Sequence, residues 1–517
     1  MKLNYKRTIL VGFAFFLIMT FWQAYDTIIP KILTDKFGMS QAYSGIVMAL
    51  DNVLALFMLP LFGALSDKSK SKMGRRTPYI LIGTLVACVA FMGLTFSDNM
   101  QLTAISDVST VNSVSSLETL YDNDYNTTLQ TPDGEKYVLK DIFTREEFTA
   151  ITTESTKTTS GKEINLYTNY VVPARQAFAW QKTVSDPTPL IIFMITLLIV
   201  LIAMAVFRSP AVALMPDVTI KPLRSKANAI INLMGTAGPM CVLALGIVFA
   251  TGSAENAMMS YTTFFAAVVG LMLLALLIFM LTVREPKFVA DMKAESEKYG
   301  IKEDEEEEKS GKAGKLTAGQ RASLLFILAS VVFWYMGYNA VTSKYSVYAP
   351  NVLNQSYNTT LLLANAAAII SYIPVGILSS KLGRKKTILA GVIMLAVAFG
   401  VASTLRAGSP SIIMNAIFCL AGIGWATINV NSFPMAVELA SAGNVGKYTG
   451  FYYTASMAAQ TITPYLSGKL MDLRGMTTLF PYATVTVCVA FVTMLFVRHG
   501  DNKPTARKGL EAFDIDD

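Results

Sequence analysis

The stretch Gly63–Pro78, GALSDKSKSKMGRRTP, determines how we interpret the rest of the chain. It closes one apolar segment and opens another, and it carries five cations against one acid, Asp67. This pattern predicts a tight basic hairpin between two membrane helices. Gly63 lets a neighbouring helix approach closely, and Gly74 permits a turn that a side chain would obstruct. Asp67 is expected at a helix end, within reach of a helix N-terminus or of an arginine from another segment.

This loop resembles the signature loop of the major facilitator superfamily, whose pattern is roughly G-x-L-x-D-K/R-x-G-R-R/K. The residues at the matching places are Gly63, Asp67, Gly74, Arg75 and Arg76. The additional residues before Gly74, together with Pro78, resemble more specifically the sucrose transporters, which belong to the glycoside–cation symporter group. Residues 207–232, FRSPAVALMPDVTIKPLRSKANAIIN, are similar to the sucrose-transporter segment that joins helices four and five. The loop with its flanks more distantly resembles melibiose permease.

The resemblance implies an all-α membrane protein with twelve transmembrane helices in two pseudo-symmetric six-helix bundles, the major facilitator fold. It also implies a symporter that takes up a di- or oligosaccharide with a cation. Two departures leave that cation open between a proton and sodium. Ala55 and Leu59 stand where melibiose permease has cation-binding acids, and Leu201 stands where sucrose transporters carry an acid in helix four.

The composition points to a membrane protein independently of the resemblance. Of the 517 residues, 53% are hydrophobic and 15% are charged, and apolar runs of about twenty residues recur along the chain. The net charge of +7 does not indicate nucleic-acid binding, because the cations cluster in short loops beside helix ends. The four cysteines lie inside apolar runs and the single histidine, His499, follows the last one, so their spacing predicts no metal site.

Twelve apolar runs predict twelve membrane helices in two sets of six. They are 8–33, 41–65, 79–97, 188–207, 226–250, 260–282, 320–341, 357–378, 387–405, 410–433, 447–468 and 478–497. The predicted units are helices one to three (1–97), an external insert (98–187), helices four to six (188–282), a charged cytoplasmic linker (283–319), helices seven to twelve (320–497) and a cytoplasmic tail (498–517).

The distribution of cations predicts the orientation. Clusters precede helix one (Lys2, Lys6, Arg7), follow helix eight (Lys381, Arg384, Lys385, Lys386) and follow helix twelve (Arg498, Lys503, Arg507, Lys508). With an even number of helices these clusters share one side. We therefore expect both termini in the cytoplasm and the protein in a plasma or inner membrane.

Two segments outside the helices differ in character. The linker 283–319, with its run KEDEEEEKSGKAGK, has too little apolar surface to fold alone and predicts a flexible connector. The insert 98–187 is polar but contains several aromatic residues, and Asp133–Gly134 before an alternating run predicts a β-hairpin. We expect a small ordered external cap that is dispensable for membrane insertion.

The basic loop is repeated in the second half. Gly376–Lys386 follows helix eight, with Ser380 where the acid would be, and PAVALMPDV before helix five is echoed by PMAVELASA before helix eleven. Two related bundles with a central site suit alternating access. The remaining predicted gating residues are Asp217, Arg224, Gly383, Arg384 and Glu438.

Two acids inside helices are candidates for cation coupling, since polar groups at bilayer depth face the interior or a water-filled cavity. Asp51 lies about ten residues into helix two, roughly 15 Å from its outer end at 1.5 Å per residue. Asp26 lies nearer the outer end of helix one, where a hydrated interfacial acid is an equal alternative. The sequence indicates no lysine or arginine at the depth of either acid.

Aromatic and amide side chains recur on single helix faces, as expected of sugar sites in which rings stack on a pyranose and amides bind hydroxyls. Each stripe alone is also typical of interhelical packing. The predicted substrate-binding residues are Trp22, Gln23, Asn228, Asn232, Tyr335, Tyr338, Asn339, Asn365, Trp425, Asn429 and Gln460.

Other functions remain open at this point. The chain shows no catalytic triad, metal motif or phosphate loop, so we expect no enzyme activity, no cofactor and a monomer in the bilayer. One alternative is transport of a non-sugar such as a drug or organic anion, although an anion carrier would need an intramembrane cation. The other is a sensor that binds an external ligand through the insert, although a sensor would not need gating loops.

Overall fold

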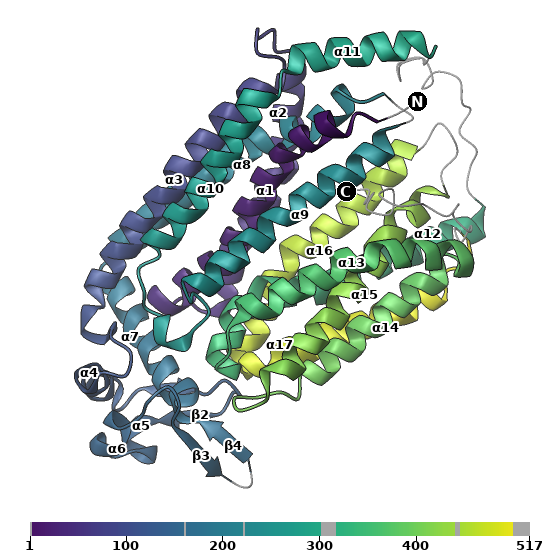
Figure 1. Ribbon diagram of the computed structural model, residues 1–517. Coiled ribbons are helices and arrows are strands. Elements are labelled where there is room, and N and C mark those ends of the chain that lie inside the picture. The colour runs from purple at the N-terminus through teal and green to yellow at the C-terminus, as the bar shows by residue number, and fades with distance from the viewer. Residues whose placement is uncertain (1–2, 160–161, 221–222, 301–316, 440–444, 500–517) are drawn as a thin grey trace.

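The structure, a computed structural model, describes residues 3–159, 162–220, 223–300, 317–439 and 445–499. Twelve long helices in these residues form two halves that lie side by side, the first purple to teal and the second green to yellow in Figure 1. The first half comprises α1 (Tyr5–Lys31), α2 (Gln41–Asp67), α3 (Thr77–Ala104), α8 (Thr188–Asp217), α9 (Arg224–Val248) and α10 (Thr262–Thr282). The second comprises α12 (Ala318–Tyr348), α13 (Tyr357–Leu382), α14 (Arg384–Ala402), α15 (Ser411–Val437), α16 (Val445–Arg474) and α17 (Leu479–Leu495).

Eleven helices in the described part of the chain are long and apolar enough to cross a membrane. The twelfth, α16, has 30 residues, which is also long enough, but it is less apolar because its last turns carry Lys469, Asp472 and Arg474. Helices satisfy their own backbone hydrogen bonds, as a spanning segment in lipid requires. The predicted all-α membrane fold is therefore confirmed.

Each half has its own apolar core, and the two halves share structural details. Residues such as Phe91, Phe207 and Phe265 are fully buried in the first half, and Ile388, Phe480 and Val487 in the second. The first helix of each half also runs into a π-helical turn. These turns are Ile32–Lys36 after α1 and Ala349–Leu353 after α12.

Several helices are longer than the apolar runs predicted. Helix three was expected to end at residue 97 and continues to Ala104, and helix four was expected to end at 207 and continues to Asp217. The reason is that polar and charged residues at these ends stay helical where other helices or the insert cover them. We call the end where α3 and α8 meet residues 105–187 the insert end, and the opposite end the linker end.

The linker is not unstructured throughout. Residues Glu285–Lys298 form α11, which lies across the linker end in Figure 1 and pairs with α1 through Arg7 and Glu295 at 3.3 Å. The expectation of a flexible connector is therefore wrong for these residues. The charged run 302–315 lies outside the described residues.

The insert is a folded unit that projects from the insert end (Figure 1). Its elements are α4 (Val114–Asp124), β1 (Thr128–Gln130), β2 (Lys136–Val138), α5 (Leu139–Ile142), α6 (Arg145–Thr149), β3 (Thr156–Thr159), β4 (Lys162–Asn165) and α7 (Val172–Ser185). The hairpin predicted at Asp133–Gly134 joins β1 to β2, with Leu129 opposite Tyr137. Gly134 has a φ of 94°, which favours glycine at this turn.

The insert docks on the second half of the protein. Thr477 N–H donates to the Pro132 carbonyl at 3.0 Å, and Arg406 pairs with Asp133 at 3.3 Å. An added Cβ on Gly134 would collide with the Arg474 carbonyl, so the hairpin turn approaches the end of α16 closely. These contacts show that the insert packs on the second half; that it is dispensable for membrane insertion stays a prediction.

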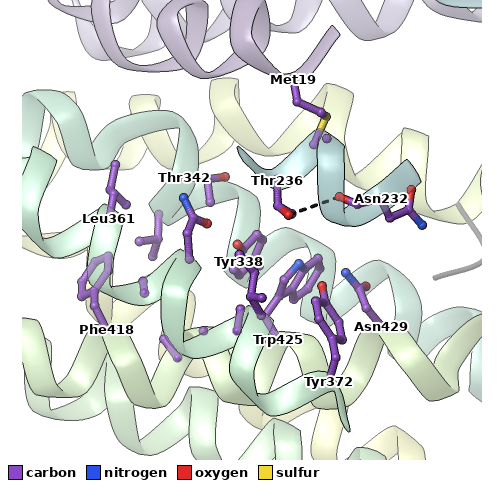
Figure 2. Close-up of a pocket in the computed structure, with 18 of the residues that line it drawn as sticks. Met19, Asn232, Thr236, Tyr338, Thr342, Leu361, Tyr372, Phe418, Trp425 and Asn429 are labelled. Atoms are coloured by element: carbon purple, nitrogen blue, oxygen red, sulfur yellow. Dashed lines mark hydrogen bonds between the residues drawn. The ribbon is translucent and has the colours of Figure 1, made fainter. Parts of the chain in front are cut away.

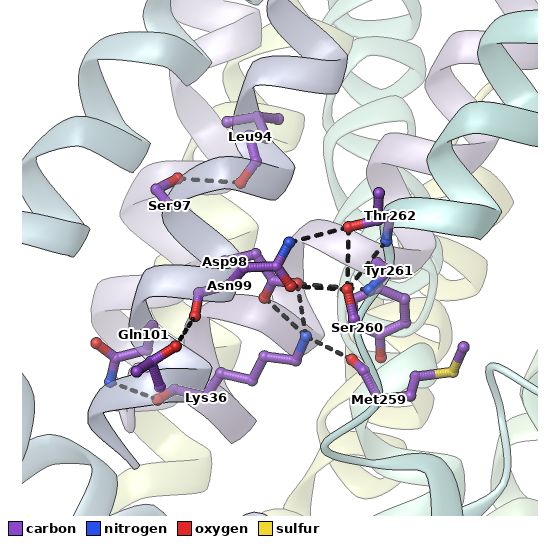
Figure 3. A network of polar contacts seen from close by, with 11 residues as sticks. Lys36, Leu94, Ser97, Asp98, Asn99, Gln101, Met259, Ser260, Tyr261 and Thr262 are labelled. Carbon is purple, nitrogen blue, oxygen red and sulfur yellow. Dashed lines mark hydrogen bonds and ion pairs between the residues drawn. The ribbon is translucent and has the colours of Figure 1, made fainter. Parts of the chain in front are cut away.

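A fully buried ion pair fixes the root of the insert (Figure 3). Lys36 Nζ lies 2.7 and 2.8 Å from the two carboxylate oxygens of Asp98, and it also donates to the Met259 carbonyl at 2.7 Å. Gln101 Nε2 donates to the Lys36 carbonyl and to Thr183 on α7. Removing one partner of such a pair leaves an uncompensated buried charge, so the pair holds the π-helical turn after α1 against α3, and Gln101 joins α7 to them.

One buried acid gives the insert a pH dependence. Asp124 is fully buried, its Oδ1 accepts from Asn123 and Gln181, and its Oδ2 has no hydrogen-bond partner among the described residues. Burial raises the pKa of Asp124 from 3.8 to about 6. In the unfolded chain the carboxyl keeps its ordinary pKa. The protonated Asp124 side chain therefore stabilises the folded insert, relative to the ionised side chain, below about pH 4. This stabilisation is lost as the pH rises through about 6.

We predict that Asp124→Asn makes the insert more stable at neutral pH. Removing the cost of the buried carboxylate should raise the local unfolding free energy of the insert by about 1–2 kcal/mol. This is less than the full pKa shift would give, because relaxation of the surroundings and water penetration reduce the cost of a buried charge. Hydrogen exchange of α4 amides in the full-length protein at about pH 4 and about pH 7 measures this. A difference between the two pH values as large in Asp124→Asn as in the wild type would contradict the assignment.

Candidate functional site

A central cavity of about 270 Å³ lies between the two halves. Its walls come from α1 and α9 of the first half and from α12, α13, α14 and α15 of the second (Figure 2). Its polar and aromatic lining consists of Asn232, Thr236, Tyr338, Thr342, Asn365, Tyr372, Trp425 and Asn429. Small-molecule sites are generally such concave spaces, mostly apolar with a few placed polar groups.

Stacked aromatic rings form one wall of the cavity. The rings of Tyr338 and Trp425 are parallel within 2°, with centroids 3.7 Å apart, and Tyr335 meets Trp425 edge-on at 5.1 Å. Figure 2 shows the Tyr338 and Trp425 side chains together with Tyr372 at this wall. Stacking restricts the rotamers of these rings, so the wall is a preorganised flat surface.

Amide groups face the same space. Asn232, Asn365 and Asn429 line the cavity from α9, α13 and α15. An amide offers both donors and an acceptor, as needed to bind hydroxyl groups. Thr236 lies one turn from Asn232 and donates to its carbonyl at 3.2 Å (Figure 2).

Six of the predicted binding residues lie outside this lining. Tyr335 packs against Trp425 from behind, and Asn339 Nδ2 donates to the Tyr335 carbonyl of its own helix at 2.9 Å. Trp22 packs edge-on against Tyr25 at 5.3 Å. The other three, Gln23, Asn228 and Gln460, are half-buried on α1, α9 and α16.

The two candidate acids lie near each other in the first half. Asp26 and Asp51 are close enough to interact electrostatically with one another and with Tyr25. Asp26 also interacts electrostatically with Tyr338, which is a residue of the cavity lining. Asp26 is solvent-accessible although it lies among the helices, and Asp51 is half-buried with Asn52 Nδ2 donating to it at 2.8 Å.

An arginine that the sequence did not indicate accompanies these acids. Arg208 interacts electrostatically with Asp51, and its guanidinium lies 5.7 Å from the Trp22 ring centroid. The expectation of no cation at this level is therefore wrong. The apolar run ended at residue 207, whereas α8 continues to Asp217 and carries Arg208 inside the helix. Lys31 and Lys344 are also buried within their helices.

Polar contacts join the two halves at the insert end. The carboxylate of Asp472 on α16 accepts from the backbone N–H groups of Gln41 and Ala42, both at 2.8 Å, and so caps the N-terminus of α2. Lys344 Nζ, fully buried on α12, donates to the Gln41 carbonyl at 2.6 Å. An added Cβ on Gly45 would collide with the Pro464 carbonyl, so α2 and α16 also touch through their backbones.

Further contacts at this end involve the π-helical turns and α13. Asn351 Nδ2 donates to Asp35 at 3.1 Å, and Gln176 of the insert donates to the same carboxylate oxygen at 3.1 Å. Thr251 and Tyr357 are linked by their hydroxyl groups at 2.9 Å. The described polar contacts between the halves therefore gather where the insert lies.

The basic loop lies at the linker end. Arg76 pairs with Asp67 at 2.5 Å and with Asp217 at 2.8 Å. Asp67 was expected to reach a helix N-terminus or an arginine of another segment. It pairs instead with Arg76 of its own loop, directly before α3, and the loop folds back at Gly74 with a φ of 112°. An added Cβ on Gly63 would lie 2.9 Å from Ser209 Oγ, which shows the close approach of α8. The Arg75 backbone N–H donates to Glu285 of α11.

Glu285 is a residue that sequence reasoning missed. Its carboxylate also accepts from the Arg76 and Thr77 backbone N–H groups at 3.0 and 2.8 Å, so it caps α3 from another segment. The only signal was an acid directly after the last apolar run of the first half. Nothing in the sequence showed that α11 folds back onto the loop.

The second half repeats this arrangement in part. Arg384, directly after Gly383 with its φ of 91°, pairs with Glu438 at the end of α15. This matches the pairing of Arg76 with Asp217 at the end of α8. Arg224, by contrast, reaches back to the Pro216 and Thr219 carbonyls at 3.4 Å.

Comparisons with family models cover most of the chain. The model described as Major Facilitator Superfamily matches residues 176–371 and 345–514. The model described as MFS/sugar transport protein matches residues 10–122.

Curated relatives match over a short segment. Sucrose transport protein SUT5 of Oryza sativa subsp. japonica is 35% identical over 60 residues, which is 12% of this chain and 11% of that protein. Sucrose transport protein SUC3 of Arabidopsis thaliana is 37% identical over 60 residues, which is 12% of this chain and 10% of that protein. The matches thus span only about a tenth of each relative.

Solved structures match over the whole chain. The inward-open xylose transporter XylE from E. coli has a TM-score of 0.57 at 15% identity, covering 97% of this chain and 98% of that one. A bacterial homologue of the iron transporter ferroportin, in an inward-facing state, has a TM-score of 0.57 at 13% identity, covering 96% and 99%. At these identities the likeness shows the fold alone.

We predict that Lys344→Met weakens the joint at the insert end. Losing a charge-assisted hydrogen bond across the two halves should shift the equilibrium toward opening there by roughly tenfold. The rate at which a membrane-impermeant maleimide, supplied on the insert side, labels Thr342→Cys measures the shift in a background without native cysteines. Lys385→Met is the control, because Lys385 donates to the Leu495 and Val497 carbonyls within one half. Equal labelling of the two variants would refute this role of Lys344.

Proposed function

The chain belongs to the major facilitator superfamily, and from that premise we propose that it carries a di- or oligosaccharide across a cell membrane together with a cation. The observation that carries the proposal is the central cavity. There the parallel Tyr338 and Trp425 rings stand beside the amides of Asn232, Asn365 and Asn429. Flat rings suit the faces of pyranoses, and amides suit their hydroxyl groups.

Alternating access supplies the mechanism. The substrate cavity lies between the halves, and the joint of Lys344 and Asp472 with the start of α2 closes the insert end. When that joint opens and the linker end closes, the cavity faces the other side. The gating residues of the linker end are Gly63, Asp67, Gly74, Arg75, Arg76, Asp217, Arg224, Gly383, Arg384 and Glu438.

The orientation follows the positive-inside rule. The basic loop and Lys385 lie at the linker end, which we place in the cytoplasm with both termini. The insert is then outside, and a substrate that enters from its side and leaves at the linker end is imported.

Asp51 and Asp26 are the proposed coupling groups, with a proton as the cation. Asp51 interacts electrostatically with Arg208, and Asp26 interacts with Tyr338, which lines the substrate cavity. Protonation of Asp51 would remove its attraction to Arg208 and change the charge balance between α2 and α8. Substrate binding and protonation are thereby coupled through neighbouring side chains on α1 and α2.

A second candidate function is transport of an organic anion, which Arg208 favours. Anion carriers need a cation at bilayer depth, and Arg208 lies inside α8. Asp51 compensates that charge, however, and the described lining of the central cavity contains no charged side chain. A neutral polyol therefore fits the cavity better than an anion.

We predict that Trp425→Ala removes saccharide binding at the central cavity, because it deletes the ring on which Tyr338 and the substrate stack. Burial of a large apolar side chain contributes about 1.5–3 kcal/mol and aromatic stacking about 0.5–1.5 kcal/mol more, so affinity should fall by at least about tenfold. Counterflow of labelled sucrose, melibiose and raffinose in proteoliposomes measures it, with Trp425→Phe as the matched control. Counterflow by Trp425→Ala at the wild-type rate would exclude this site.

For coupling, we predict that Asp51→Asn abolishes uphill accumulation and spares substrate exchange, because asparagine resembles the protonated acid and cannot cycle. External alkalinisation on adding substrate should vanish in the same variant. Asp26→Asn is the comparison. If Asp51→Asn still accumulates saccharide against its gradient, Asp51 is a structural polar group. If sodium drives wild-type uptake, the proton assignment fails.

A further inference from the structure

A second cavity lies at the insert end, outside the joint between the halves. Its volume is about 420 Å³, larger than that of the central cavity. Its walls come from three parts of the chain: the start of α2 in the first half, β1 and α7 of the insert, and the end of α16 in the second half.

The lining of this outer cavity combines exposed aromatic rings with amides. Trp180 and Tyr43 are 39% and 58% exposed, so their faces are available to a ligand. Gln130, Gln176 and Asn351 add amide groups from the insert and the second half, and the last two also donate to Asp35. Rings beside amides are the same chemistry as in the central cavity.

One buried polar group has no partner within the described part of the protein. Gln41 lines the outer cavity and is only 6% exposed, yet its Oε1 accepts no hydrogen bond. A buried acceptor that is left unsatisfied costs about 1–3 kcal/mol, so a rotation of the Gln41 side chain into the cavity would let this oxygen accept from a ligand.

The charges at the cavity favour a neutral ligand. Asp472 is the acid in the lining, and both of its carboxylate oxygens are occupied by the backbone N–H groups of Gln41 and Ala42. Lys344, whose ammonium group reaches the Gln41 carbonyl, interacts electrostatically with Asp472 and balances its charge. A charged ligand would therefore gain little electrostatic binding energy in this cavity. A polyol, by contrast, can donate a hydrogen bond to Gln41 and stack on Trp180.

We propose that the outer cavity is a second saccharide-binding site, separate from the central one. The substrate class rests on the proposed function, whereas the site itself rests on the Trp180 ring, the Gln41 acceptor and the enclosing walls. Because three parts of the chain form the walls, the site is complete only while the insert end is closed. A saccharide that binds there more tightly in the closed state than in the open state shifts the equilibrium toward the closed state. The size of the shift equals the ratio of the two affinities when the site is saturated.

Equilibrium binding to the full-length Trp425→Ala variant tests the proposal, because this background lacks the Trp425 ring and binds saccharide more weakly at the central cavity. Isothermal titration with sucrose, melibiose and raffinose should show one remaining site for at least one of them. Adding Trp180→Ala should weaken that binding at least tenfold, whereas Trp180→Phe should largely preserve it. Tyr125→Ala, which truncates an exposed aromatic residue elsewhere on the insert, is the matched control and should have no effect.

Two results would overturn the proposal. They are the absence of saccharide binding in Trp425→Ala, and binding that Trp180→Ala leaves unchanged. The proposed transport function is judged separately, by uptake through the wild-type protein. Binding that depends on Trp180 supports the outer site even if uptake fails.

Discussion

The capping of α2 by Asp472 is the contact on which the arrangement of the two halves depends. A carboxylate of the second half accepts from two backbone N–H groups of the first half, at the helix terminus where such groups otherwise lack partners. Lys344 adds a buried ammonium group on the following carbonyl. A small displacement of the halves would leave each of these polar groups without a hydrogen-bond partner. The halves therefore separate at this end only when water replaces all of these hydrogen bonds together.

This joint also relates the two cavities to each other. The central cavity lies between α9 and the helices of the second half, and the outer cavity lies on the far side of the joint beneath the insert. Both cavities present aromatic rings and amides. The described lining of the central cavity contains no charged side chain, and the charge of Asp472 in the outer cavity is balanced by Lys344. The protein thus concentrates its charged contacts in the joints and leaves the two cavities to neutral polar chemistry.

The sequence was sufficient to predict the overall fold. Long apolar runs determine membrane helices because lipid admits few other structures, and the repeated basic loop indicated two related halves. The hairpin at Asp133–Gly134 followed from its turn residues. Helix ends were less predictable, since Arg208 and Asp98 are charged residues that remain inside helices where other parts of the chain cover them.

Most of the site required tertiary information. The helix stripes named helices that carry aromatic and amide groups, but the rotation of each helix decides which of these groups reach the cavity. Asn365 lines it, for example, whereas Asn339 bonds to its own helix. The partners of Glu285, Lys36 and Lys344 are distant in sequence, and a single sequence contains no signal that pairs them.

Uptake by proteoliposomes that contain only the full-length protein tests the account most directly. Labelled sucrose, melibiose and raffinose would be offered under an inward proton gradient, under an inward sodium gradient and without either. The account predicts that at least one saccharide accumulates above its external concentration, and only under the proton gradient. Entry of all three at the rate of empty liposomes, with uptake of an organic anion by the same vesicles, would contradict it.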